Sequence, residues 1–147
     1  MLVQDDFDIL MGSSKYFNDN SAIIIPDNGG KINRYIYSEN SKDQFVLNIE
    51  RGRIDLRKVK YQTRDKSTNT VLLRIDTKGP RHLNPDGNFV ECPHMHIYRE
   101  NYGDKWALPL DSSIFSDSDN LGNLLRDFLI YFNVQDIPTI FSVEKMV

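Results

Sequence analysis

The sequence predicts an α+β domain in which an N-terminal and a C-terminal helix flank an antiparallel meander sheet of about six or seven strands. Three observations support this prediction. An amphipathic stretch opens the chain, short segments of alternating apolar and polar residues follow between turn signals, and an apolar stripe at helical spacing lies near the C-terminus. With 147 residues and no internal repeat or linker, the chain is expected to form a single domain over residues 1–147.

The two helices are predicted from the spacing of apolar side chains. Residues 3–16 place Val3, Phe7 and Leu10 on one side, and the acidic residues of the first turns favour the helix dipole. The second helix, over about residues 120–133, carries an unbroken apolar stripe that favours packing against a sheet. The stripe consists of Leu121, Leu124, Leu125, Phe128, Leu129 and Phe132.

The strands are predicted from alternation between turn signals rich in Gly, Asn, Asp and Pro. A change of phase between Leu56 and Val59 predicts a bulge or a bend there. The tail is expected to add a short strand at residues 139–141. The other extended segments are residues 22–25, 32–37, 45–50, 54–61, 70–76, 94–98 and 105–110.

Charge is distributed unevenly along the chain. The net charge is −3, yet residues 51–81 carry 10 Lys and Arg against 3 Asp and Glu, between acidic flanks. A basic central segment favours an anionic partner such as RNA. The acidic N-terminus, the single cysteine (Cys92) and the lack of a long apolar run predict a cytoplasmic protein without a membrane partner.

Residues 78–99 contain all three histidines of the chain and form the candidate site. His94, His96 and Tyr98 are spaced by two, so a strand would project them from one face while the residues between them point to the core. His82 precedes an Asn-Pro-Asp-Gly turn that would fold it back beside them. This convergence is the geometric assumption on which the candidate site depends.

Two histidines beside cations match what RNA cleavage by an internal hydroxyl requires. One imidazole removes a proton, the other returns one, and a cation stabilises the charge on phosphorus. The chain is therefore interpreted as a metal-independent endoribonuclease without a cofactor, with His94 and His96 sharing the proton transfer. The candidate catalytic residues are His82, His94, His96, Tyr98 and Arg81. The candidate RNA-binding residues are Lys78, Arg74, Arg57, Lys58, Lys60 and Arg64. The candidates for base stacking are Tyr35, Tyr37, Tyr61 and Tyr98.

Two other interpretations of the same stretch remain open. The pair His94 and His96 would bind a metal if His82, Asp86 or Glu91 completed the ligand set, although the chain lacks the HExxH and CxxC motifs of common metal sites. In the second interpretation the histidines are half-buried structural groups of an edge strand. The basic segment is then an ordinary solvated sheet face.

Sequence motifs add a family resemblance. The segments GPRHLNPDG, PHMHIYRE and NYGDKWALPL, within residues 79–110, resemble the motifs of a family of small bacterial and prophage proteins that is known as a domain of unknown function. The resemblance extends from the N-terminal helix to about Val134. It implies a fold and a setting in phage–host conflict. The predicted layout also resembles that of small ribonuclease toxins of the barnase–RelE type, although those toxins are basic overall and this chain is acidic at both ends.

In an alternative function, the acidic segments at the two ends of the chain form the binding surface. The chain would then bind and inhibit a host nuclease or defence complex without catalysis, because an acidic surface can imitate nucleic acid. Asp111, Asp117 and Asp119 are the residues that would carry this contact. The expected partners are thus RNA or a host or phage protein, such as a cognate antitoxin or a defence complex.

Overall fold

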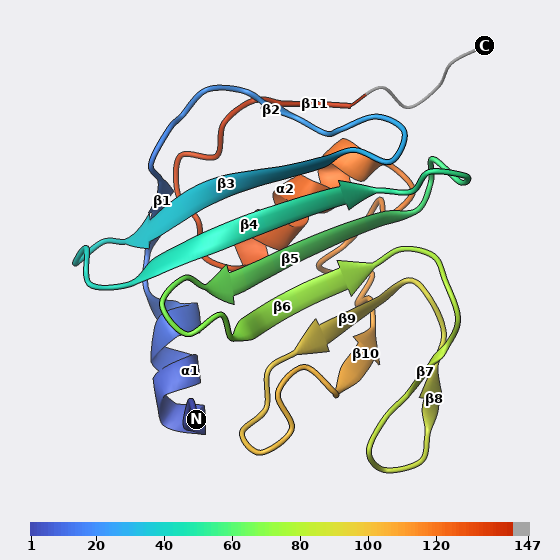
Figure 1. Cartoon of the computed structure of the whole chain (residues 1–147), viewed down its shortest axis with the longest axis horizontal. Helices are drawn as coiled ribbons and strands as arrows, with labels where there is room; N and C mark the ends of the chain where they lie inside the picture. Colours follow the sequence, from blue (N-terminus) through green and yellow to red (C-terminus); the bar gives the residue numbers. More distant parts are fainter. Residues whose placement is uncertain (143–147) are drawn as a thin grey trace.

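One seven-stranded antiparallel sheet crosses the middle of the molecule (Figure 1). The computed structural model describes residues 1–142. Neighbours in the sheet are also successive along the chain, apart from short elements inserted after the first and the fifth strand. In spatial order the strands are β1 (Lys15–Phe17), β3 (Lys31–Ser38), β4 (Gln44–Arg51), β5 (Val59–Asp65), β6 (Val71–Asp76), β9 (His94–Ile97) and β10 (Ala107–Pro109). The predicted meander is confirmed.

Two helices complete the α+β fold. The helix α2 (Leu121–Tyr131) lies behind the sheet in Figure 1 and buries its apolar stripe against one sheet face. Asn120 begins this helix, because its side chain accepts a hydrogen bond from the backbone N–H of Asn123. The helix α1 (Gln4–Gly12) lies at one end of the sheet. Among residues 1–142, neither helix is long and apolar enough to cross a membrane.

Two short ladders lie outside the main sheet. The strands β7 (His82–Leu83) and β8 (Phe89–Val90) form a hairpin between β6 and β9. The strands β2 (Ile23–Ile24) and β11 (Ile140–Phe141) pair in parallel with each other. Residues 22–25 and 139–141 are thus extended where the sequence predicts strands, but they pair outside the meander. The end of the tail, residues 143–147, lies outside the described residues.

The N-terminal helix ends at Gly12, whereas the helical spacing of its apolar residues predicts a helix over residues 3–16. The reason is a buried lysine. Lys15 is 0% exposed, and its ammonium group donates to the carbonyls of Met11 (3.2 Å), Ser13 (2.9 Å) and Phe132 (2.8 Å). These bonds satisfy carbonyls near the ends of both helices, where the helix itself leaves them without partners. The backbone of Lys15 joins the sheet as the first residue of β1, so tertiary pairing overrides the helical pattern.

The predicted change of direction near residues 56–59 is present as a bend. The strand β5 begins only at Val59, and the preceding residues form turns rather than sheet. The register between β5 and β6 shifts between Thr63 and Arg64, further along the strand than the sequence suggests.

We expect the variant Lys15→Met to lose stability relative to the wild type as the pH rises from about 8 toward 10.5. Burial lowers the pKa of Lys15 from 10.5 to about 8, so in this window the unfolded chain holds a proton that the folded chain has released. Raising the pH therefore stabilises the wild type, by up to roughly 3 kcal/mol across the window, and leaves the variant without this gain. Urea unfolding of both proteins in unit steps from about pH 7 to pH 10 measures the difference. A difference independent of pH would contradict the lowered pKa.

Alternation along the strands gives the main sheet two unlike faces. One face contacts α2 and contributes to the core. Leu73, Ile75, Met95 and Ile97 are residues of β6 and β9 on that face. The register of the same two strands pairs Arg74 with His96 and Asp76 with His94. Since neighbouring residues of a strand point to opposite sides, these four polar side chains lie on the face away from α2.

Candidate active site

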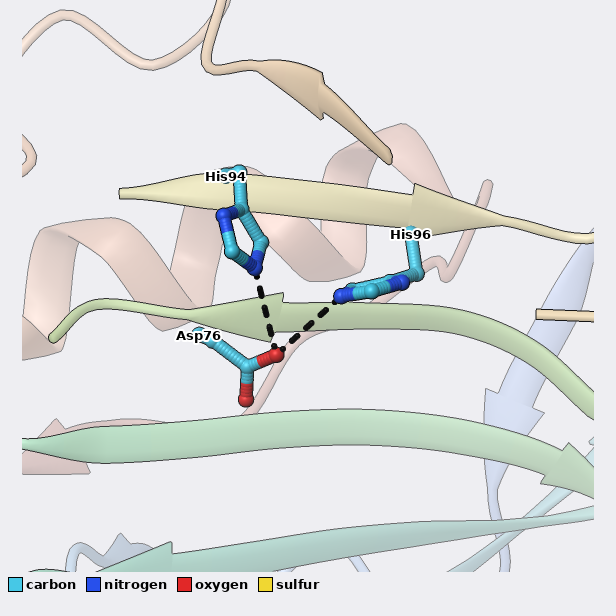
Figure 2. A group of neighbouring side chains, drawn as sticks. All are labelled: Asp76, His94 and His96. Carbon is cyan, nitrogen blue, oxygen red and sulfur yellow. Dashed lines mark ion pairs between the residues drawn. The ribbon is translucent and has the colours of Figure 1, made fainter. Parts of the chain in front are cut away.

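The candidate site is built on β6 and β9, on the sheet face away from α2. Asp76 is the last residue of β6, and His94 and His96 are on β9. Figure 2 shows the three side chains pointing toward one another from these two strands. The Nε2 atom of His94 lies 3.5 Å from Oδ2 of Asp76, and the Nε2 atom of His96 lies 3.3 Å from the same oxygen. The two-residue spacing of the histidines thus places both rings on one face, as the sequence predicts.

The third imidazole joins them from the β7–β8 hairpin. The ring centre of His82 lies 4.6 Å from that of His96 and 6.0 Å from that of His94. Asn84 anchors this hairpin, because its side-chain amide donates to the Ala107 carbonyl and accepts from the Ala107 N–H, each at 2.9 Å. The predicted convergence of the three rings is therefore present. We call His82, His94, His96 and Asp76 the histidine cluster.

Each imidazole of the cluster directs one ring nitrogen at a backbone carbonyl. A carbonyl oxygen only accepts, so that nitrogen carries a hydrogen, and in a neutral ring the other nitrogen is then a bare acceptor. The contacts are His82 Nε2 to Lys105 (2.6 Å), His94 Nδ1 to Glu91 (3.2 Å) and His96 Nδ1 to Asp104 (2.8 Å). In neutral rings, the acceptor nitrogens of His94 and His96 are the Nε2 atoms that face Asp76.

Arg74 fixes the charge state of the cluster. Its guanidinium group donates to Asp76 (3.1 Å) and Asp104 (3.0 Å), and one of its nitrogens lies 3.0 Å from Nε2 of His96. Burial alone would raise the pKa of Asp76. The contact with His96 and the Arg74 charge outweigh burial and hold the pKa of Asp76 well below its usual range. Burial and the neighbouring His96 lower the pKa of His94, so the carboxylate is ionised and the His94 ring is neutral near pH 7.

A cavity of about 330 Å³ opens above the cluster. The three histidines and Asp76 line it, together with Arg74 and a rim of basic side chains. The rim consists of Lys58, Lys60, Lys78 and Arg81. His94 and His96 are only 3% and 1% exposed, whereas His82 is half-buried. An anion in this cavity would therefore meet several cations at the rim. His82 is the imidazole most exposed to it.

Cys92 borders the same cavity without the properties of a nucleophile. Burial and the nearby Asp76 carboxylate raise the pKa of its thiol, so the sulfur stays protonated near pH 7. Its Sγ donates weakly to the Pro80 carbonyl and lies 3.6 Å from Nδ1 of His94. The sequence-based view of Cys92 as unreactive fits this environment, although the side chain is only partly buried.

Two tyrosines that the sequence offered for the site lie in the core. The strand β9 ends at Ile97, and the next ring, that of Tyr98, packs against Phe7 of α1 with 5.4 Å between ring centres. Its hydroxyl donates to the Leu2 carbonyl. Tyr61 is fully buried beneath α2 and donates to the Leu121 carbonyl at 2.8 Å. The predictions that Tyr61 and Tyr98 stack RNA bases and that Tyr98 supports the catalytic histidines are therefore wrong, because both rings are covered and Tyr98 does not line the cavity.

Two of the predicted RNA-binding arginines point elsewhere as well. Arg57 pairs with Asp55 at 3.1 Å and borders a neighbouring cavity of about 590 Å³. That cavity shares Lys78 with the one above the cluster. Arg64 donates to Asn48 at 3.1 Å, further along the open sheet face. Lys58, Lys60, Arg74 and Lys78 do converge on the cluster, as the candidate set predicts.

The sequence-based set lacked Asp76, which the structure places at the centre of the cluster. A signal was available, since Arg74 and Asp76 are spaced by two at the end of a predicted strand, directly before the histidine-rich stretch. Among residues 1–142, the group of Asp76, His94 and His96 has the composition of a metal site, with ligand atoms within 4.8 Å of one another. The acidic ligands considered from sequence do not join it. Asp86 bonds Asn88 in the hairpin turn, and the Glu91 carbonyl contacts His94.

The acidic residues of the alternative function lie in the segment before α2. Asp111 accepts hydrogen bonds from the hydroxyl (2.7 Å) and the N–H (2.9 Å) of Ser113, and these bonds lower the pKa of Asp111. Asp117 accepts from the Asn123 side chain at 3.2 Å. Asp119 is exposed beside the larger cavity. Two of the three carboxylates therefore have local roles in turns, and an inhibitory surface remains a prediction.

A comparison with known families gives one match. A model of a family of unknown function, DUF6978, matches residues 2–134. No curated protein and no solved structure matches the chain. The resemblance to a domain of unknown function is thereby confirmed over most of the chain, and its prophage setting stays a prediction.

Proposed function

Because the chain belongs to the DUF6978 family, whose function is unknown, we propose a function from the site itself: the protein binds RNA and cleaves phosphodiester bonds above the histidine cluster. The observation that carries the proposal is the convergence of three imidazoles under a cavity rimmed by lysine and arginine. Cleavage needs a group that takes the proton of the attacking hydroxyl and cations that balance the charge growing on phosphorus. The cluster and its rim provide both kinds of group.

The parts of the site have different tasks in this proposal. The rim lysines hold the phosphate through its charge. His82 is the accessible imidazole, and with its Nε2–H bonded to Lys105 its Nδ1 is free to accept the proton of a ribose hydroxyl. In this proposal His96, beneath His82, returns a proton to the leaving 5′-oxygen as the bond between that oxygen and phosphorus breaks, and His94 forms the floor of the cavity beside it. The neighbouring cavity of about 590 Å³, which shares Lys78, gives room for an adjacent nucleoside.

The open sheet face supports RNA over a small anion as the substrate. The ladder register aligns Asn33, Asn48 and Gln62 in one row that continues through Arg74 to His96. Adjacent strands are about 4.8 Å apart, so the row extends about 19 Å from β9 to β3, which is longer than one nucleotide. Its amides can bond base edges, and Tyr35, 46% exposed beside this row, can stack a base.

The direct experiment is a cleavage assay with the purified chain. We expect cuts in a single-stranded RNA oligonucleotide and none in the matched DNA, because DNA lacks the internal 2′-hydroxyl. The expected products end in a 2′,3′-cyclic phosphate, which mass spectrometry identifies. Equal cleavage of DNA, or no cleavage of several RNA sequences, would refute the proposal. In a toxin-like setting, expression of the wild type in bacteria would arrest growth and that of His96→Ala would not.

We expect removal of two rim charges, in Lys58→Ala/Lys60→Ala, to weaken RNA binding uniformly across sequences. Each lost phosphate contact lowers the slope of log K against log salt by about 0.7 for a single strand, so the double variant should lose about 1.4. Fluorescence anisotropy over a salt series measures this slope. The matched control is Lys42→Ala/Arg53→Ala, which removes the same charge from two exposed residues away from the cavity. Equal slopes in the two double variants would show that the rim does not hold phosphate.

A further inference from the structure

The hydrogen-bond pattern of the cluster leaves three acceptor atoms facing one point. The Nδ1 atoms of His94 and His96 are bonded to backbone carbonyls, so in neutral rings their Nε2 atoms carry lone pairs. Both lone pairs face Oδ2 of Asp76. Oxygen and nitrogen lone pairs repel one another at this range unless a cation lies between them. The Arg74 guanidinium group bonds to Oδ2 of Asp76 and lies 3.0 Å from Nε2 of His96, so it relieves the repulsion for these two atoms but not for Nε2 of His94.

The separations match ligands of a common ion better than they match hydrogen bonds. The Asp76 oxygen lies 3.5 Å from Nε2 of His94 and 3.3 Å from Nε2 of His96, and N–H···O bonds are usually about 2.7–3.2 Å. Around a tetrahedral zinc with ligand bonds of about 2.0–2.1 Å, neighbouring ligand atoms are about 3.3–3.4 Å apart. The two separations from Asp76 therefore match those of a zinc ligand set, and the three ligand atoms lie within 4.8 Å of one another.

The surroundings are those that metal-binding histidines usually have. A ligand imidazole commonly donates its other N–H to a carbonyl or a carboxylate, which fixes the ring and its tautomer. The carbonyls of Glu91 and Asp104 do this for His94 and His96. Arg74 touches both Asp76 and His96, and it also pairs with Asp104 at 3.0 Å. When a metal ion displaces the Arg74 guanidinium group from Asp76 and His96, the guanidinium group can remain bonded to Asp104.

We propose that Asp76, His94 and His96 bind one divalent transition-metal ion, with zinc the best fit, and leave its fourth position open to the cavity. Two histidines, one carboxylate and an open position form the ligand set of a catalytic rather than a structural zinc. A metal there would polarise a phosphate oxygen and lower the pKa of a bound water. It would replace the metal-independent scheme that the sequence favours, while the binding itself does not depend on RNA being the substrate.

The test is metal binding by the full chain, measured after chelator treatment and dialysis against zinc. We expect about one zinc per wild-type chain by elemental analysis, and less than a tenth of that in Asp76→Asn and in His96→Gln. With cobalt(II) as the probe, the wild type should show the strong visible absorption of a tetrahedral site. Circular dichroism checks that each variant is folded, and His94→Gln replaces any variant that is not.

The control variants address the neighbouring groups. Cys92→Ala and His82→Ala should keep the full stoichiometry, because neither side chain is a proposed ligand. A wild type that binds no more zinc than folded Asp76→Asn, or a Cys92→Ala variant that loses it, would overturn the assignment. RNA binding measured in the presence of chelator separates the two proposals, since the lysine rim acts without the ion. A failed metal site would leave RNA binding intact, and failed RNA binding would leave the zinc stoichiometry unchanged.

Discussion

Replacing His96 by alanine is expected to reduce RNA cleavage about 10³-fold while the chain stays folded. The His96 ring contacts the other groups of the site. Its Nε2 atom lies 3.0 Å from the Arg74 guanidinium group and 3.3 Å from Oδ2 of Asp76, and its ring centre lies 4.6 Å from that of His82. A positioned proton-transfer group raises a reaction rate by a factor of about 10²–10⁴. If His96 is instead a metal ligand, we expect its removal to lower the rate at least as much. Initial rates on one RNA oligonucleotide, with unfolding followed by circular dichroism, give both quantities.

Tyr98→Phe is the comparison that separates a site effect from a packing effect. Tyr98 is nearly as buried as His94 and His96, but it contacts α1 rather than the cluster. Loss of its hydroxyl bond to Leu2 should cost about 1 kcal/mol of stability and leave the cleavage rate within about twofold. A folded His96→Ala protein that cleaves at the wild-type rate would remove the cluster from the mechanism. If His96→Ala unfolds, His96 has a structural role, and Asp76→Asn becomes the variant that decides.

The largest loss of stability is expected from Phe128→Ala. Phe128 is fully buried at the contact between α2 and the sheet, where its ring centre lies 6.2 Å from that of Tyr61. Deletion of a buried phenyl ring removes its transfer free energy and leaves a cavity, at a cost of about 3–5 kcal/mol. Domains of this size are stable by about 5–15 kcal/mol, so the variant should lose a large share of the total. Urea unfolding monitored by circular dichroism measures the loss.

Ile130→Ala on the same helix is the matched control. Ile130 is 55% exposed and two residues from Phe128, so the substitution has a similar effect on helix propensity and removes little buried surface. Its stability should stay within about 0.5 kcal/mol of the wild type. Equal losses in the two variants would mean that α2 is not held to the sheet by its apolar stripe.

The sequence predicts the main sheet well because each strand has a local cause. The alternation in residues 32–37 and 45–50 requires one buried and one open face, and turn residues separate the segments. The same logic predicts that His94 and His96 share a face. It cannot predict that Lys15 leaves the first helix, because the carbonyl of Phe132 that binds its ammonium group is distant in the sequence.

The chemistry of the site divides in the same way. The histidine-rich stretch, the basic segment before it and the strand that carries Arg74 and Asp76 can all be found in the chain itself. Which carboxylate faces the imidazoles depends on the register of β6 against β9, and register is a property of paired strands rather than of either one. The position of Tyr98 likewise depends on where β9 ends and α1 packs.

The alternating pattern in the chain is enough to predict the α+β meander and the common face of two histidines. Strand pairing and packing are needed to bring the third histidine, an aspartate and several lysines to that face and to place two tyrosines elsewhere. The difference lies in the range of the interactions. Periodicity and turn chemistry act between neighbours in the chain, whereas the position of one side chain against another is fixed by strand pairing and packing between distant segments.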